Sequence, residues 1–77
     1  MSDWTEDPEG RYSNHLEIAH NAFEFVIQFG QFYGEAGPRI HTRIITAPYY
    51  AKCFAGLLEE SVRRYEETHG TIVPVEP

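Results

Sequence analysis

The sequence has few of the residues that hold small proteins together by covalent or metal cross-links. Its 77 residues include one cysteine, Cys53, so a disulfide within the chain is excluded. Its four histidines do not form a Cys/His cluster of the kind that binds structural zinc. A chain this short buries only about 60 % of the surface that its unfolded form exposes. We therefore expect a partner subunit to supply the missing stabilisation.

Positive charge and long apolar runs are also scarce. Six Lys and Arg residues stand against twelve Asp and Glu residues, which gives a formal net charge of −6. This balance argues against binding to nucleic acid or to an anionic membrane surface. No apolar run approaches the roughly 20 residues of a membrane span, and the acidic beginning of the chain is unlike a signal peptide. We expect a cytoplasmic protein whose partners are proteins.

Two hydrophobic periods follow one another along the chain and predict its fold. Alternating residues predict strands at 15–19, 23–29 and 40–46, with breaks at 21–22 and 30–39, and a helical repeat runs over 48–69. Proline at the first helical position and glycine after the last one support these helix limits. The predicted fold class is α+β: a three-stranded antiparallel β-meander followed by one long C-terminal α-helix, completed by homo-oligomerisation.

Composition divides the chain into one domain and two tails. Residues 12–70 form the predicted single β-β-β-α domain. Residues 1–11 are acidic and are expected to be a flexible tail, in which Trp4 is the one large aromatic residue. Residues 71–77 are expected to be an extended C-terminal tail, since their prolines oppose a helix.

The predicted helix is longer than the predicted sheet. About 22 residues at 1.5 Å each make a helix of roughly 33 Å, whereas a strand of about seven residues spans about 23 Å. We expect the helix to cover the phenylalanine-rich face of the sheet and to extend beyond it. Its apolar stripe consists of Ala51, Phe54, Ala55, Leu58, Val62 and Tyr65. The overhang and the open sheet edges predict a homodimer or a higher oligomer.

This architecture predicts protein binding, because the sequence contains no catalytic motif. We expect no enzymatic activity and no cofactor. The predicted function is that of a small homo-oligomeric protein–protein interaction module. Such an adaptor or chaperone-like protein would hold a segment of another protein at a sheet edge or in an apolar groove. The predicted contact residues are Val26 on the second sheet face, and Tyr33, Ile45, Tyr49, Tyr50 and Tyr65.

Three polar residues define an alternative function. His15, Glu17 and His41 are predicted to share one sheet face, where they would form a ligand, metal or catalytic site at a subunit interface. No H-x-x-x-H spacing supports a metal centre, so we expect surface or interface histidines instead. Lys52 favours a thiolate at Cys53. Cys53 nevertheless borders the helical stripe, and we expect a buried, unreactive thiol.

Several segments resemble one known family. They are residues 12–20 (YSNHLEIAH), 24–31 (EFVIQFGQ), 43–48 (RIITAP), 51–52 (AK) and 64–67 (RYEE). The segment E-F-V-x-x-F-G-Q followed by P-x-x-A-K resembles the bacterial and archaeal family catalogued as domain of unknown function 3467. The family usually has an acidic residue where Gln28 stands and a serine where Ala47 stands. The resemblance implies the order strand–strand–strand–helix and brings no activity.

The alanine at position 47 has a predicted energetic consequence. Ala47 cannot accept a hydrogen bond through its side chain, so the helix loses a cap worth about 1 kcal/mol unless Thr46 substitutes.

Overall fold

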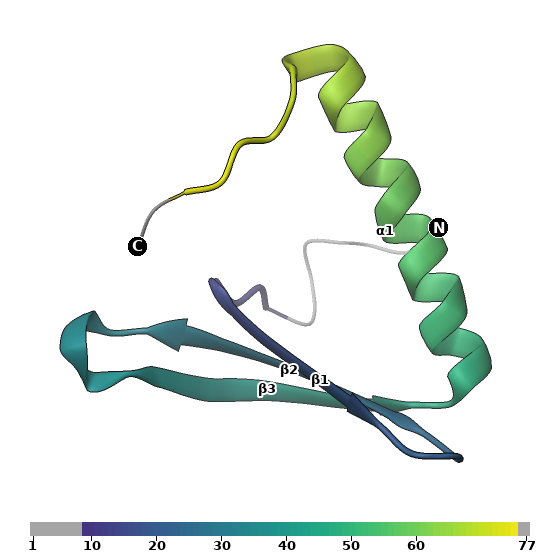
Figure 1. Ribbon diagram of the computed structural model, residues 1–77. Helices are drawn as coiled ribbons and strands as arrows, with labels where there is room; N and C mark the ends of the chain where they lie inside the picture. Colours follow the sequence, from purple (N-terminus) through teal and green to yellow (C-terminus); the bar gives the residue numbers. More distant parts are fainter. Residues whose placement is uncertain (1–8, 76–77) are drawn as a thin grey trace.

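The computed structural model describes residues 9–75 and contains one small sheet and one long helix (Figure 1). Its elements are β1 (His15–His20), β2 (Phe25–Phe32), the 3-10 turn η1 (Gly34–Ala36), β3 (Pro38–Thr46) and α1 (Pro48–His69). Both strand pairs are antiparallel and the sheet order is β1-β2-β3. The predicted meander followed by one helix is therefore confirmed. Trp4, in the predicted N-terminal tail, lies outside the described residues.

The turn between β1 and β2 is organised by one side chain. The Oδ1 atom of Asn21 accepts hydrogen bonds from the backbone amides of Phe23 and Glu24, at 2.7 and 3.0 Å. Asparagine commonly closes turns in this way. Phe23 consequently belongs to the turn and is 83 % exposed. The prediction that it begins the second strand and contributes to its apolar face is wrong.

The second hairpin is longer than the sequence predicts. The predicted loop at 30–39 is mostly strand, because β2 continues to Phe32 and β3 begins at Pro38. Only the short turn around η1 remains, where Gly34 and Gly37 adopt φ values of 57° and 85°. Residues with side chains rarely adopt these angles. The glycines at the turn were interpreted correctly, and the error came from including Gly30.

Gly30 lies inside β2 because two backbones approach closely there. A Cβ atom at this position would lie 2.3 Å from the carbonyl oxygen of Arg39. The pairing register shifts at the same place, from Phe29 opposite Thr42 to Gly30 opposite Ile40. His41 is therefore an extra residue in β3, which is the arrangement of a β-bulge. The sequence signal was a glycine inside an alternating strand.

The segment before β1 is held to β2 by hydrogen bonds. The carbonyl of Gly30 accepts bonds from the amide of Asn14 at 3.1 Å and from the hydroxyl of Ser13 at 2.8 Å. The Asn14 side chain accepts a bond from the amide of Phe32 at 3.0 Å. These contacts extend the pairing of the first two strands beyond the end of β1.

The helix has the predicted limits. Its N-terminus lacks a side-chain cap, whereas its C-terminus is closed by a backbone hydrogen bond. Pro48 occupies the first position, and Ala47 precedes it in an extended conformation without any side-chain cap. Thr46 therefore does not replace the missing cap. At the other end, the amide of Gly70 donates to the carbonyl of Glu66 at 3.0 Å. The backbone groups at this end are thus partly satisfied.

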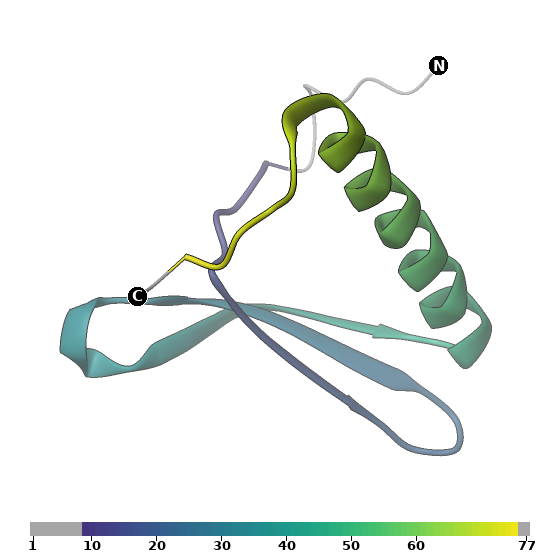
Figure 2. The same cartoon turned by 45° about the horizontal axis from the view of Figure 1, so that its top comes forward.

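The helix does not cover the sheet of its own chain. Figures 1 and 2 show α1 rising steeply from the end of β3, so that its far end stands clear of the sheet. The close contacts between elements are those between neighbouring strands. Among the described residues, only Ile27 and Ala51 are buried apolar side chains. The prediction that the helix packs on the phenylalanine-rich face is wrong for a single copy. A single residue, Ala47, links β3 to α1 in an extended conformation.

We predict that the substitution Ala47→Ser stabilises the protein. A serine hydroxyl at the position before the helix can accept a hydrogen bond from the first helical turn, worth about 1 kcal/mol. Urea unfolding at a fixed protein concentration measures the change in free energy. Ala47→Val, which adds atoms without an acceptor, serves as the control. Equal stability of the two variants would show that the first turn is already satisfied.

We predict that the substitution Gly30→Ala destabilises the protein by about 1–3 kcal/mol, because the new methyl group displaces the backbone of β3. Gly56→Ala is the matched control. It lies in α1 with nothing within 4 Å of an added Cβ, so it should stabilise the helix by about 1 kcal/mol. Thermal or urea unfolding of both variants gives the comparison. A neutral effect of Gly30→Ala would contradict the close approach at the bulge.

Candidate interaction surface

One face of the sheet carries most of its large apolar side chains. We call this the apolar sheet face, and it consists of Leu16, Ile18, Phe25, Ile27, Phe29 and Ile44, which the strand register brings to one side. Ile27 on the central strand is 7 % exposed, whereas Leu16 and Ile18 on the edge strand are 62 % and 64 % exposed. The centre of this face is therefore covered and its β1 side lies open.

The helix has an apolar stripe that is also open. The helix stripe comprises Ala51, Phe54, Ala55, Leu58, Val62 and Tyr65, which recur at spacings of three and four residues. Ala51 is buried, but Phe54, Leu58 and Tyr65 are 42 %, 51 % and 52 % exposed. Side chains of this size are usually found inside folded proteins. The stripe is thus a second apolar surface without cover in a single copy.

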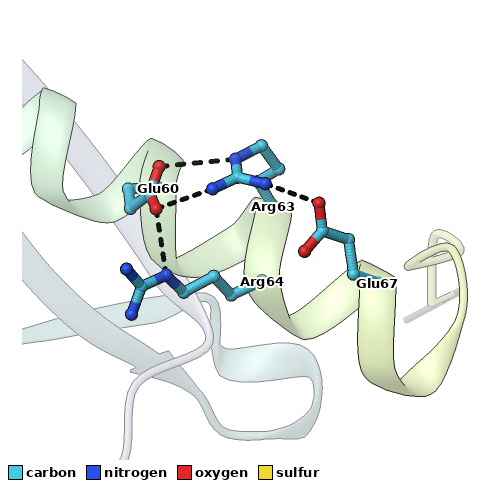
Figure 3. Close-up of polar contacts among 4 residues, drawn as sticks. All are labelled: Glu60, Arg63, Arg64 and Glu67. Atoms are coloured by element: carbon cyan, nitrogen blue, oxygen red, sulfur yellow. Dashed lines mark hydrogen bonds and ion pairs between the residues drawn. The ribbon is translucent and has the colours of Figure 1, made fainter.

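Charged residues form a cluster on one side of the helix, as Figure 3 shows. The Glu60 carboxylate accepts hydrogen bonds from Arg63 at 2.7 Å and from Arg64 at 2.9 Å, and Arg63 also pairs with Glu67. At 100° per residue, this charged cluster lies about 180° from the centre of the helix stripe. The charged side is suited to water, which leaves the stripe as the side for packing.

The open surfaces have a measurable size. A compact chain of 8.9 kDa has an accessible area of about 4800 Å², whereas this chain exposes 7103 Å². The radius of gyration is 14.9 Å, compared with about 11.5 Å for a compact domain of this length. A single copy is therefore more extended than a self-sufficient domain and exposes about 2300 Å² more, an excess to which the segments outside the helix and the strands also contribute.

The second sheet face is divided into a polar row and a small apolar row. In the polar row, Gln28 joins the other two strands, donating to Glu17 and accepting from Arg43. The adjacent apolar row contains Ala19, Val26 and Ile45, which lie opposite one another in the register. This row was predicted from the alternation of β2 and β3. Ile45 is 59 % exposed, so the row is accessible.

The predicted contact residues do not form one continuous patch. Val26 and Ile45 are neighbours on the second sheet face. Tyr49 and Tyr50 are adjacent at the start of α1, with ring centroids 5.3 Å apart, and both are exposed. Tyr65 belongs to the helix stripe and lies beside His69.

Tyr33 lies apart from the other predicted contact residues. It precedes η1, at the end of the sheet away from the start of α1 (Figure 1). The six residues therefore mark three or more separate regions.

Leu16 and Ile18 are exposed residues that the sequence interpretation missed. It assigned them to a core covered by the helix, because alternation identifies which residues share a face but not what lies on that face. Cys53 is also exposed. The prediction of a buried thiol is wrong, because at 100° per residue Cys53 lies on the same side of α1 as Glu60 and Arg64, away from the helix stripe.

The three residues of the alternative site are not brought together. His15 Nε2 lies 2.8 Å from Glu17 Oε2 on the second sheet face. His41 instead lies near Phe29 and Thr42, with its Nδ1 2.7 Å from the Thr42 hydroxyl and its Nε2 2.9 Å from the Tyr12 carbonyl.

The bulge explains this separation, because one extra residue changes the face to which a side chain points. The predicted common face of His15, Glu17 and His41 is therefore wrong. Within residues 9–75, no group of three or more His, Cys, Asp or Glu side chains is placed to hold a metal ion.

The fold and its exposed surfaces define a small α+β protein with one helix beyond a three-stranded meander. Residues 4–74 match the family described as protein of unknown function DUF3467, and the chain belongs to this family. No curated protein and no solved structure matches the chain. In the part of the chain that the structure describes, α1 is too polar to cross a membrane and no other helix is long enough.

We predict that the substitution Glu60→Gln changes the free energy of unfolding by no more than about 1 kcal/mol, because exposed ion pairs are screened by water. The oligomeric state should remain unchanged. Glu59→Gln is the matched control, since Glu59 has no ion pair among the described residues. Urea unfolding and sedimentation at low and high salt measure both effects. A loss of several kcal/mol, or dissociation, would place the charged side of the helix inside an interface.

Proposed function

We propose that the protein is a small homo-oligomeric interaction module that holds a segment of another protein. The observation that carries this proposal is the exposure of both the apolar sheet face and the helix stripe in a single copy. Patches larger than a few hundred Å² are rare on monomeric proteins and usually mark interaction sites. Self-association would cover part of this surface and stabilise a chain in whose described part only two apolar side chains are buried.

The features that remain would suit a protein partner. β1 and β3 are edge strands in the three-stranded sheet, with backbone groups available for strand addition. The row formed by Ala19, Val26 and Ile45 offers apolar contacts on the second sheet face. A net charge of −6 keeps such a protein soluble while its apolar surfaces are open. An adaptor or a chaperone-like protein needs this combination.

The alternative proposal, a ligand or metal site at a subunit interface, has narrower support. It rests on the close pair of His15 and Glu17, which offers one imidazole and one carboxylate. A third protein ligand would have to come from another copy, because His41 of the same chain lies on the other sheet face. A bound metal in the purified oligomer would favour this alternative.

Native mass spectrometry of the tagged protein, purified gently from its natural host, tests the proposal. We expect a homo-oligomer, with a dimer at 17.8 kDa from two chains of 8.9 kDa plus the mass of two tags, carrying one stoichiometric polypeptide. The variant Ile45→Lys should remain oligomeric and lose most of that polypeptide, because a charge replaces the exposed part of the apolar row.

Three other results of this experiment would favour a different site or contradict the proposal. An oligomer with a metal or small-molecule mass, absent from a His15→Ala variant, would favour the interfacial site. A polypeptide that Ile45→Lys retains would move the binding region to another surface. A bare monomer at all concentrations would contradict the proposal.

A further inference from the structure

We infer that the occupant of the apolar sheet face is the helix of a second copy. In this arrangement, α1 of each chain packs its helix stripe on the apolar sheet face of the other chain, around a two-fold axis. The inference rests on the proposed function and deepens it, because it names the partner and the contact that produce the oligomer. The same contact would also explain why both the apolar sheet face and the helix stripe are exposed in a single copy.

The two surfaces match in chemistry, and the helix is long enough to cover the sheet. The 22 residues of α1 span about 33 Å, and the eight residues of β2 span about 27 Å. Three strands spaced about 4.8 Å apart provide a width that one helix of about 10 Å diameter can cover. Both surfaces are lined by aliphatic and aromatic side chains. The charged side of the helix would then face solvent.

The connection between β3 and α1 favours exchange between chains. A single residue, Ala47, separates Thr46 from Pro48, and its φ and ψ of −73° and 156° continue the direction of the strand. The helix consequently leaves the end of the sheet, as Figure 2 shows. Short connections of this kind prevent an element from folding back and promote its exchange with an identical chain.

The exposed area agrees with a dimer. Each chain exposes about 2300 Å² more than a compact chain of its mass. The apolar sheet face and the helix stripe contribute to this excess, together with the segments outside the helix and the strands. Obligate homodimers bury about 2000–5000 Å². A two-fold exchange also closes on itself, so it covers both surfaces without leaving a further copy to be added.

Intersubunit complementation tests the exchange. The helix variant Leu58→Asp and the sheet variant Ile18→Lys each damage both contacts of their own homodimer. We expect each variant alone to dissociate at least about 100-fold more readily than wild type. A mixture of the two variants forms heterodimers in which one intact helix meets one intact sheet face. Native mass spectrometry should therefore detect a heterodimer that exceeds either variant homodimer, and sedimentation should give its Kd.

Matched controls separate position from chemistry. Leu57→Asp places the same charge next to Leu58 but about 100° around the helix, and Ile45→Lys places a lysine on the second sheet face. Both should remain dimeric. Far-UV circular dichroism establishes that each variant is folded. If either dimer-breaking variant is unfolded, the pair Leu58→Ala and Ile18→Thr tests the same complementation with smaller changes.

The outcomes distinguish this inference from the proposed function. Recovery of dimers on mixing supports exchange of helices. A dimeric wild type whose two variants dissociate without recovery on mixing overturns it in favour of helix-to-helix or sheet-to-sheet contact, and the proposed function survives. Variants that remain dimeric overturn it in the same way. A wild type that stays monomeric, with the apolar face filled by another protein, overturns both the exchange and the homo-oligomeric proposal.

Discussion

The link between β3 and α1 is the constraint on which the rest of this structure depends. Ala47 alone joins a strand to a helix of 22 residues, and it adopts an extended conformation. The helix therefore begins where the sheet ends and does not pack on it in a single copy. As a consequence, the two elements with the largest apolar surfaces in the chain leave each other exposed. Every feature that suggests association follows from this separation.

The same constraint explains why the core is so small. Burial of one large aliphatic side chain contributes about 1.5–3 kcal/mol, and only Ile27 among the described residues reaches this state. Ordering the backbone costs about 1–2 kcal/mol per residue. Hydrogen bonds along two strand pairs and one helix define the secondary structure, but they do not replace apolar burial as the main stabilising contribution. A second copy would provide that burial, so folding and association would be coupled.

The sheet contains a second constraint, at the bulge where Gly30 faces Ile40. The close approach of the β3 backbone requires a residue without a side chain there, and the extra residue His41 is displaced to the other face. The outer part of the sheet therefore presents a different set of side chains from the one that simple alternation predicts. This accounts for the separation of His41 from His15 and Glu17, and hence for the loss of the predicted His/His/carboxylate set.

Strand order, helix limits and side-chain faces near the middle of the sheet could be predicted from the sequence. Local signals were sufficient for them: the alternation of β2, the Asn21 turn, Pro48 and Gly70. The strand ends around Gly30 and Phe23 were predicted wrongly. A glycine reads as a loop in a single sequence, and whether Phe23 pairs with a neighbour depends on the turn geometry. The candidate site was predicted only in part, because the row of Ala19, Val26 and Ile45 follows from alternation whereas the exposure of Leu16 and Ile18 does not.

The sequence by itself determined the periods of hydrophobicity, the acidic charge, the absence of a possible internal disulfide and the identity of the residues on each side of the helix. The charge and the lack of a disulfide depend on composition alone. The hydrophobic periods and the sides of the helix depend on neighbours within a few positions. Only the tertiary structure decided that α1 stands away from the sheet, that β3 contains a bulge and that the helix stripe remains open. Packing between elements distant in sequence depends on the angle at Ala47 and on the distance between backbones at Gly30. A glycine inside an alternating strand signals a close approach of backbones but does not fix its distance, and no local pattern encodes the angle at Ala47.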